Sequence, residues 1–345
     1  MSNKISDLGE SWLLKFIIDR ISKIEDSILI PGDDAFDFIC HGRIICSGDM
    51  LVEHTDIPPG MTLRQAGRKA IVAVISDLAA KGAHPRYIVT QLGLRRDMMI
   101  DEFIELWTGL EDACNEYRVK IVGGDTNESN ELVISVFGIG FSEKPIPRTG
   151  ARPGDIVATT GQFGTTYTGL HALFNSITDK KWDRLRQSVL YPRAKLSEGI
   201  TIARLGLATS SIDSSDGLAA SLQQLSQASN VGFMIDKLPI DPLAAEYAYR
   251  YGLDVFDAVM FGGEEYELVV TLPESAIDKV NAELSKIGSR LIPIGTTTEK
   301  KELNVAWQGS IRKVISGGWE HFTSKGLDRK RIISDSLNRA TTHQK

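Results

Sequence analysis

Residues 31–58 read PGDDAFDFICHGRIICSGDMLVEHTDIP, and this stretch sets the expectations for the rest of the chain. It contains two short apolar runs, Phe36–Cys40 and Arg43–Cys46, which are rich in residues that favour strands. The pair His41-Gly42 between them is typical of a tight turn. The pattern therefore predicts a β-hairpin.

This hairpin would bring acidic side chains from its two ends together. Carboxylates gathered in this way repel one another unless a cation lies among them, and magnesium prefers such oxygen ligands. Gly-Asp pairs are equally typical of turns and solvated strand ends, so the stretch alone leaves metal binding and turn formation as open alternatives. The acidic residues are Asp33, Asp34, Asp37, Asp49, Glu53 and Asp56.

The composition excludes several classes of protein. A chain of 345 residues with 42% hydrophobic content is too long for one ordinary core and suggests two domains. The net charge is −6 and no block is rich in Lys or Arg, so nucleic acid is not an expected partner. Cys40, Cys46 and Cys114 form no CxxC pair. Cys40 and Cys46 lie in apolar runs, so we expect them to be small buried residues. No signal-peptide pattern or membrane-spanning run is present, so we expect a cytoplasmic protein.

The first part of the chain predicts a mixture of helices and strands. Helices are expected at residues 7–24, 62–81 and 100–117 from their apolar periodicity. Strands are expected at residues 86–94, 119–122 and 132–141, the second of them running into Gly123-Gly124-Asp125-Thr126-Asn127. Residues 144–155 are rich in Pro, Gly and Arg, so we expect a first domain at residues 1–147.

The second part predicts an α/β domain at residues 148–322, followed by a polar tail at 323–345. Strands are expected at 156–160, 208–212, 232–235, 267–272 and 291–295. Helices are expected from about residue 167, at 193–205 after a polar insert, at 218–229 and at 275–287. The fold class is therefore α+β with two domains.

Five segments place a small residue and an aspartate at the end of an apolar element. Any one of them is typical of a turn, but five together with few neighbouring cations favour a magnesium site. Magnesium prefers carboxylates combined with substrate phosphates, which indicates a nucleotide substrate. The segments are Gly32-Asp33, Gly48-Asp49, Ser76-Asp77, Gly124-Asp125 and Ser215-Asp216, with Asp213 beside the last.

The common phosphate-binding and catalytic motifs are missing. The sequence has no GxxxxGK[ST] loop, no GxGxxG after a strand, no HExxH and no GxSxG. The segment Gly161–Thr166 (GQFGTT) precedes a helix and could hold phosphate there, although a plain strand–helix turn explains it equally well. Metal ions are therefore the expected means of holding a nucleotide.

Six motifs in order resemble the thiamine-monophosphate kinase family. They are GDDA, SGDMLVE, ISDLAAKGAHP, VGGDTN, SIDSSDGL and GGEEYEL, and the match to the family spans about Ile30 to Phe322. The resemblance implies an N-terminal mixed α/β domain with a dimer-forming sheet and a C-terminal α/β domain of the aminoimidazole ribonucleotide synthetase-like type. It implies magnesium-dependent transfer of the ATP γ-phosphate to thiamine monophosphate by a homodimer.

The resemblance also implies roles for individual residues. The implied metal ligands are Asp33, Ser47, Gly48 through its carbonyl oxygen, Asp49, Asp77, Asp125, Asp213 and Asp216. The implied ATP contacts are Trp107, Gly124, Asp125, Arg148 and Ser215, and Trp107 fits equally well as a core aromatic residue. The implied substrate contacts are Asp56, Glu264 and Trp319.

Two departures from the family pattern are visible. Many members have His-Phe where this chain has Asp56-Ile57, and Gly-Gly-Glu-Asp-Tyr where this chain has Glu265 at the fourth position. The alternatives are another enzyme of the same superfamily and a nucleotide-binding regulator without activity. Selenophosphate synthetase would require a cysteine in an N-terminal glycine-rich loop, and the hydrogenase-maturation enzyme a C-terminal cysteine; this chain has neither.

Overall fold

The computed structural model describes residues 4–32, 35–40 and 42–314. The chain divides into two compact units. Unit 1 comprises Met1–Leu78 and Ala83–Glu143, and unit 2 comprises Ala79–Gly82 and Lys144–Lys345. The chain passes from unit 1 to unit 2 after Glu143, whereas the expected first domain extends to residue 147. Asp33, Asp34, His41, Trp319 and the tail at 323–345 lie outside the described residues.

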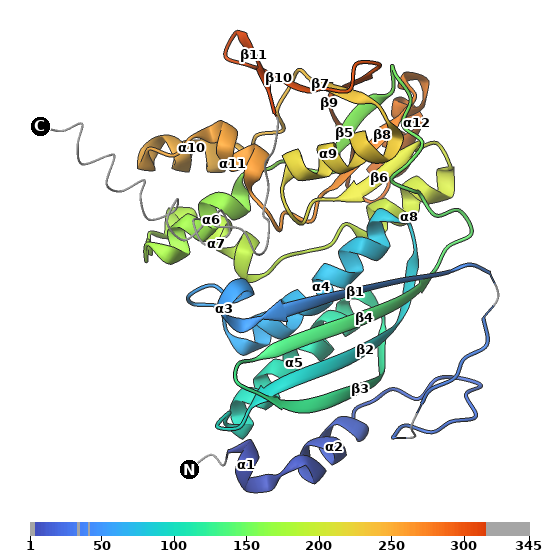
Figure 1. The fold of residues 1–345 in the computed structure, drawn as a ribbon, viewed down its shortest axis with the longest axis vertical. Coiled ribbons are helices and arrows are strands. Elements are labelled where there is room, and N and C mark those ends of the chain that lie inside the picture. Colours follow the sequence, from blue (N-terminus) through green and yellow to red (C-terminus); the bar gives the residue numbers. More distant parts are fainter. Residues whose placement is uncertain (1–3, 33–34, 41, 315–345) are drawn as a thin grey trace, which may run out of the picture. The chain divides into compact units, whose positions relative to one another are not determined.

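Unit 1 is built on a four-stranded sheet with the order β1-β4-β2-β3 (Figure 1). Its strands are β1 (Ile44–Val52), β2 (His84–Arg95), β3 (Lys120–Ser129) and β4 (Val133–Phe141). Only the β2–β3 pair is parallel. The helices of this part of the chain are α1 (Ile5–Leu8), α2 (Glu10–Ile18), α3 (Glu53–Asp56), α4 (Leu63–Ala80) and α5 (Ile100–Tyr117).

Helix α4 packs against one face of this sheet, which we call the inner face. A side chain at Gly138 of β4 would meet Val74 and Leu78 of α4, and both of these residues are fully buried. Helices α4 and α5 approach so closely that a methyl group on Gly109 would overlap the Arg64 carbonyl oxygen. The helices predicted at 62–81 and 100–117 are thus confirmed. Their small residues serve helix–helix contact.

The predicted hairpin at residues 36–46 is wrong. Strand β1 pairs along its whole length with β4, and residues 35–40 form no strand. Phe38 instead packs its ring against Tyr87 and Phe141, with ring centroids 5.1 and 6.1 Å apart. Packing on the sheet therefore explains Phe38, whereas Ile39 of the same run is 69% exposed.

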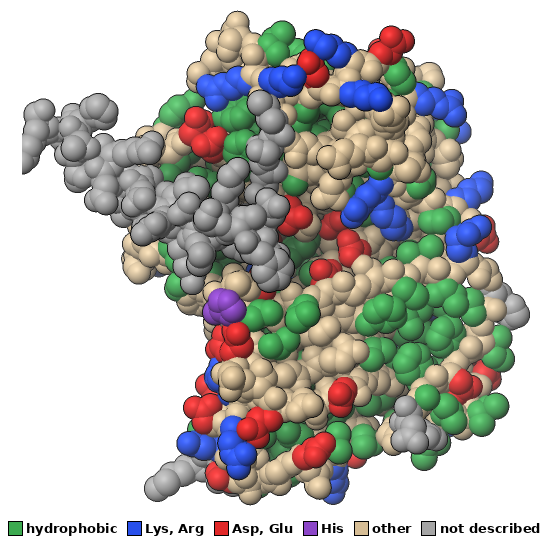
Figure 2. All heavy atoms as spheres, viewed as in Figure 1, with side chains coloured by type: hydrophobic (Ala, Val, Ile, Leu, Met, Phe, Trp, Pro, Cys, Tyr) green, Lys and Arg blue, Asp and Glu red, His purple; other side chains and the backbone are tan. Residues whose placement is uncertain are grey.

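The opposite face of the sheet, the outer face, is exposed and apolar. Residues of β1 alternate, with Ile44, Cys46, Gly48 and Met50 exposed and the residues between them half-buried or buried. Phe137 of β4 lies opposite Gly48 and is 39% exposed. Figure 2 shows hydrophobic side chains gathered over β1 and β4. The expectation that Cys46 is buried is wrong, because its strand turns it to this face.

Unit 2 contains a seven-stranded sheet with the order β11-β10-β7-β9-β5-β8-β6. All neighbours are antiparallel except β10 and β7. Its strands are β5 (Ile156–Thr159), β6 (Ser210–Asp213), β7 (Gly232–Ile235), β8 (Leu268–Leu272), β9 (Ile292–Thr298), β10 (Leu303–Trp307) and β11 (Ser310–Lys313). The five strands predicted here are all present, and β10 and β11 are additional.

Helices cover both faces of this sheet. Val157 and Val269 share one core with α9 (Leu218–Ser229) and α11 (Val255–Phe261). Ala158 and Val270 point to the other core, with α8 (Leu196–Leu205) and α12 (Ile277–Ser285). The remaining helices are α6 (Thr165–Phe174), α7 (Asp183–Leu190) and α10 (Pro242–Tyr251), with 3-10 turns η1 (Lys180–Trp182) and η2 (Glu274–Ala276). The predicted α+β class is confirmed in both units.

No helix in the described part of the chain has both the length and the apolar character needed to cross a membrane.

Candidate functional site

Unit 1 brings together three of the predicted metal ligands. Ser47 and Asp49 are alternate residues of β1, so both side chains point to the inner face, and both residues are half-buried. Asp77 lies near the end of α4, and its Oδ2 accepts a hydrogen bond from Ser47 Oγ. The small-residue face of α4 allows this approach. Gly48, between these two residues, faces the outer side, where a methyl group on it would meet the Phe137 ring.

Asp125 lies apart from this group. It belongs to β3, at the opposite edge of the sheet from β1. Residues that lie opposite one another on neighbouring strands form a row across the sheet. Gly124 is in the row of Thr90, Val136 and Asp49. Asp125 is in the next row, with Gln91 and Met50, which are both exposed. Residues of one row point to one face, so Asp125 lies on the outer face. The GGDTN segment continues β3; the expectation that the strand ends there is wrong.

The donor atoms of this inner-face group suit magnesium. Ser47, Asp49 and Asp77 offer only hydroxyl and carboxylate oxygens, which are the ligands of a hard divalent cation. Among the described residues, no three His, Cys, Asp or Glu side chains are close enough to hold a metal by themselves. The set therefore fits a metal that also takes oxygens from a phosphate.

Three other acidic residues of the opening stretch serve local structure. Asp37 accepts hydrogen bonds from Ser27 Oγ and from the N–H groups of Ile28 and Leu29, and these bonds lower its pKa. Glu53 binds Arg95 and accepts the Leu132 N–H at 2.8 Å. These contacts explain both side chains without a metal.

Asp56 also has local partners. Its Oδ2 accepts hydrogen bonds from the Val52 N–H at 2.7 Å and from Thr55 Oγ1 at 2.9 Å. The carboxylate thereby fastens the one-turn helix α3. This role accounts for an aspartate at the position, and a substrate contact remains a prediction.

Trp107 is a core residue in this structure. It is 1% exposed, and its ring lies within 6.3 Å of the Phe16 and Phe103 rings, measured between centroids. Its Nε1–H donates to Glu111 one turn further along α5, at 2.9 Å. Ring and N–H are both engaged, which favours the core interpretation of this tryptophan over an ATP contact.

In unit 2, the Asp213–Gly217 loop is held by backbone hydrogen bonds to residues 264–267. The Ser214 N–H donates to the Glu267 carbonyl at 2.9 Å, the Tyr266 N–H to Ser214 at 3.0 Å, and the Glu264 N–H to Ser215 at 2.6 Å. These bonds continue the pairing of β6 with β8. The loop that contains Asp213 and Asp216 therefore lies beside the segment that contains Glu264. Asp213 is 5% exposed and Asp216 is half-buried.

The helix start that could hold phosphate already has a hydrogen-bond acceptor, the carboxyl group of Glu265. Glu265 Oε1 accepts the N–H groups of Gly164 and Thr166 at 2.7 and 3.2 Å, and Oε2 accepts Thr165 Oγ1 at 2.8 Å. Burial raises the pKa of Glu265 to about 7, and these hydrogen bonds oppose the rise. A carboxylate therefore satisfies the N-terminus of α6, which favours the plain-turn interpretation of Gly161–Thr166.

Glu267 is a buried polar residue that the sequence motifs did not single out. Its Oε2 accepts Thr160 Oγ1 at 2.6 Å, and its Oε1 lies 3.1 Å from Lys195 Nζ. Gly161 lies against the same carboxylate, which a methyl group at that position would overlap. In the motif GGEEYE, Glu265 and Glu267 are two residues apart, and both bind residues 160–166. This spacing is the sequence signal that could have identified their contacts.

The two predicted ATP contacts of unit 2 are exposed. Arg148 and Ser215 both lie at the surface, and the Arg148 carbonyl accepts Ser229 Oγ at 3.0 Å. Asp33 and Trp319 fall outside the described residues, so their predicted roles are not placed.

Comparison with known proteins identifies both parts of the chain. Residues 32–142 match the AIR synthase related protein N-terminal domain, and residues 152–308 match its C-terminal domain. Thiamine-monophosphate kinase of Nitrosopumilus maritimus is 32% identical, over 92% of this chain and 100% of that protein. The Archaeoglobus fulgidus enzyme of the same name is 33% identical, over 92% and 99%.

A solved structure supports the same assignment. "AaThiL complexed with AMPPCP and TMP" is 29% identical to this chain and superposes with a TM-score of 0.75. The match covers 93% of this chain and 100% of that one. With relatives above 30% identity along nearly their whole length, this chain belongs to the thiamine-monophosphate kinase family.

Proposed function

We propose that this protein transfers the γ-phosphate of ATP to thiamine monophosphate, giving ADP and thiamine diphosphate. The observation that carries the proposal is family membership along both domains, at 32% identity to a named thiamine-monophosphate kinase. The related complex with AMPPCP, an ATP analogue, and TMP supports both substrates. The acidic oxygen donors in each unit suit a reaction between two phosphates.

The reaction needs no general base. The acceptor is a phosphate monoester that is largely dianionic at neutral pH, so its oxygen is already a nucleophile. A bond forms between this oxygen and the γ-phosphorus as the bond to the β–γ bridging oxygen breaks, and ADP leaves with that electron pair. The absence of a histidine among the proposed site residues therefore agrees with the chemistry.

Charge repulsion is the obstacle that the residues must overcome. In unit 1, Ser47, Asp49 and Asp77 would hold magnesium, together with Asp33 and the Gly48 carbonyl by resemblance. In unit 2, Asp213 and Asp216 would do the same. Asp125 lies on the outer face, so the metal role that the resemblance implies for it would be separate from the unit 1 group. When bound, magnesium neutralises and aligns the two phosphates. The half-buried position of Ser47 and Asp49 keeps these oxygens from being fully hydrated.

Nucleotide and substrate contacts complete the proposal. Gly124, Arg148 and Ser215 remain proposed ATP contacts, and Arg148 would place its positive charge against a phosphate. Glu264, Asp56 and Trp319 remain proposed contacts to thiamine monophosphate. A carboxylate such as that of Glu264 suits the cationic thiazolium ring, and an aromatic face would suit it as well.

We also propose that the outer face of the unit 1 sheet forms a homodimer interface. Ile44 and Met50 on this face are 44% and 60% exposed, and Phe137 lies beside them. A contiguous apolar sheet face marks a protein interaction site, and a second copy would cover it. A monomer by size exclusion at micromolar concentration would overturn this part of the proposal.

A product assay tests the function. Purified protein with Mg-ATP and thiamine monophosphate should give equal amounts of ADP and thiamine diphosphate, resolved by chromatography. Two substrate controls, formylglycinamidine ribonucleotide and selenide, test the related reactions of the superfamily. ATP binding without thiamine diphosphate would favour the regulator instead and refute the kinase assignment.

A further inference from the structure

Residues 264–267 lie between two loops of unit 2 and contact both. On one side, the N–H groups of Glu264 and Tyr266 donate to the Asp213–Gly217 loop, and the Glu267 carbonyl accepts from it, as described above. On the other side, the contacts are made by side chains. Glu265 binds Gly164–Thr166 and Glu267 binds Thr160. The segment is therefore fixed from two directions.

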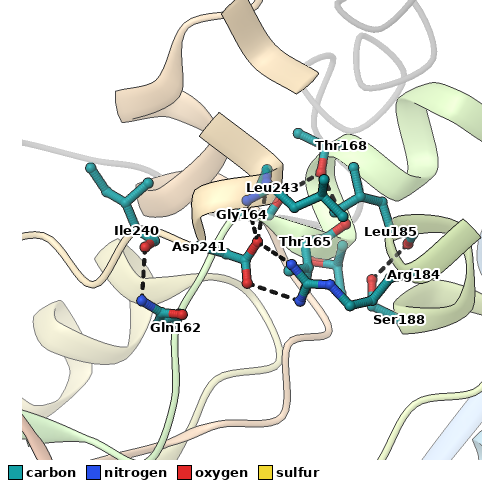
Figure 3. Close-up of polar contacts among 12 residues, drawn as sticks. Gln162, Gly164, Thr165, Thr168, Arg184, Leu185, Ser188, Ile240, Asp241 and Leu243 are labelled. Carbon is teal, nitrogen blue, oxygen red and sulfur yellow. Dashed lines mark hydrogen bonds and ion pairs between the residues drawn. The ribbon is translucent and has the colours of Figure 1, made fainter. Parts of the chain in front are cut away.

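The loop at 160–166 is itself held firmly. The Phe163 N–H donates to the Pro239 carbonyl at 2.7 Å, and the Asp241 N–H donates to the Phe163 carbonyl at 3.0 Å. Gln162 Nε2 donates to the Ile240 carbonyl at 3.0 Å, as Figure 3 shows. Asp241 in turn forms a two-pronged ion pair with Arg184. Glu265 and Glu267 thus attach the segment to an element that is anchored elsewhere.

The backbone of the segment is strained on both sides of Glu265. Glu264 has a φ of 63° and Tyr266 a φ of 53°, both in the left-handed region that residues other than glycine rarely occupy. Such conformations persist only where the surrounding structure holds them. Neither residue is glycine, so the contacts around them must hold these conformations. The N–H groups of Glu264 and Tyr266 are bonded to Ser215 and Ser214, and the neighbouring carboxylates of Glu265 and Glu267 are bonded to residues 160–166.

We infer that Glu265 and Glu267 are positioning residues that keep Glu264 in this left-handed conformation and so present its carboxylate to the substrate. The inference rests on the proposed function, in which Glu264 contacts the cationic thiazolium ring of thiamine monophosphate. Glu265 acts through the start of α6, and Glu267 through Thr160 and Lys195. Neither touches the substrate. The pair determines how well the site binds thiamine monophosphate.

The first experiment separates the two substrates. In Glu265→Ala and Glu267→Ala, the KM for thiamine monophosphate should rise about tenfold, because a mispositioned binding group loses its contribution. The KM for ATP should rise several-fold less. Glu265→Gln keeps the side-chain length and an oxygen for the Gly164 and Thr166 N–H groups, so it should recover most of the loss.

Asp155→Ala is the matched control. Asp155 is also a buried carboxylate of unit 2 that accepts a backbone N–H and a threonine hydroxyl, from Arg152 and Thr209. It has no hydrogen bond to residues 264–267 among those described. It should lower the melting temperature without changing the KM ratio of the two substrates. A folded Glu265→Ala with the same KM ratio as wild type would overturn the inference.

Hydrogen exchange tests the same inference without activity. In Glu265→Ala, peptides covering residues 262–267 and 213–217 should exchange about tenfold faster than in wild type and in Asp155→Ala. Unchanged exchange in these peptides would overturn the positioning role, whatever the enzyme does. Failure of the wild-type protein to form thiamine diphosphate would overturn only the proposed function, so the two failures are distinguishable.

Discussion

Replacing Glu265 with glutamine should make the stability of the protein less dependent on pH. The carboxyl group is half-buried at the start of α6, and burial raises its pKa from 4.5 to about 7. The folded protein therefore binds the Glu265 proton more tightly than the unfolded chain does. Stability from this group is complete below pH 4.5 and is lost as the pH rises through about 7. Glutamine does not titrate, so the variant loses no stability at this position as the pH rises.

The size of the effect follows from the same two pKa values. A rise from 4.5 to about 7, at about 1.4 kcal/mol per unit, gives about 3 kcal/mol. Water reaches part of a half-buried side chain and screens its charge, so the expected difference is about 2 kcal/mol. Relative to wild type, Glu265→Gln should thus gain about 2 kcal/mol between about pH 5 and about pH 8.

Urea unfolding at several pH values measures this difference. The free energy of unfolding is determined for wild type and Glu265→Gln in the same buffers, and their difference is plotted against pH. Contributions from all other titrating groups cancel in this difference when the two proteins share them. A carbon-13 NMR titration of the glutamate carboxyl groups gives the pKa directly.

A control of opposite sign is available in Thr165→Val. Thr165 Oγ1 donates to Glu265 at 2.8 Å and opposes the rise in pKa, so its removal should steepen the loss of stability with pH. A difference between wild type and Glu265→Gln that stays constant within about 0.5 kcal/mol over this range would refute the burial argument.

Three further predictions follow from the sheet of unit 1. Asp49→Asn and Asp77→Asn should each lower turnover by at least about 100-fold at saturating magnesium, since each removes the charge of a proposed metal ligand. The circular dichroism spectrum should stay unchanged. Near-normal rates would contradict the metal assignment. Met50→Glu should convert a dimer into a monomer by light scattering, because it places a charge on the apolar outer face, whereas the surface change Glu299→Gln should not. Gly124→Ala should lower stability by about 1–3 kcal/mol in thermal unfolding, because its methyl group would overlap the Thr90 carbonyl oxygen between β2 and β3; an unchanged melting temperature would show that these strands can separate freely.

Elements with strong periodicity could be predicted from the sequence almost to the residue. The helix expected at 100–117 is α5 (Ile100–Tyr117), and that expected at 218–229 is α9 (Leu218–Ser229). Both have an apolar face that one core buries, so the local pattern contains the information. Helices α10 and α11 were not predicted, although Asp241 before Pro242 and Asp254 are the N-cap signals that mark their starts.

Pairing between distant strands could not be predicted in this way. The Phe36–Cys40 run has the composition of a strand, but β1 takes β4 as its partner, far along the chain. Nothing local to residues 31–58 specifies that choice, because the partner residues lie at 133–141. Likewise Gly123 and Gly124 disfavour a strand, yet their pairing with β2 continues β3 through them.

The candidate site was predicted by residue type better than by position. Ser47 is hydrogen-bonded to Asp77, and Asp49 points to the same inner face, because side chains two residues apart in a strand share a face. Asp125 reaches the outer face because a register shift of one residue reverses a side chain's direction, which motif spacing does not reveal. The roles of Glu265 and Glu267 depend on a loop about a hundred residues earlier in the chain.

The division of the chain bears on how the protein can be dissected. Residues 79–82 belong to unit 2 but are encoded within the sequence of unit 1. Ala79 and Ala80 are part of the unit 2 core, and Lys81 Nζ donates to the Ser211 carbonyl at 2.7 Å. A fragment that starts at residue 144 would therefore lack four residues of its own interior. If the two halves were expressed separately, the unit 2 fragment would lack residues 79–82. Expression as a single chain supplies these residues.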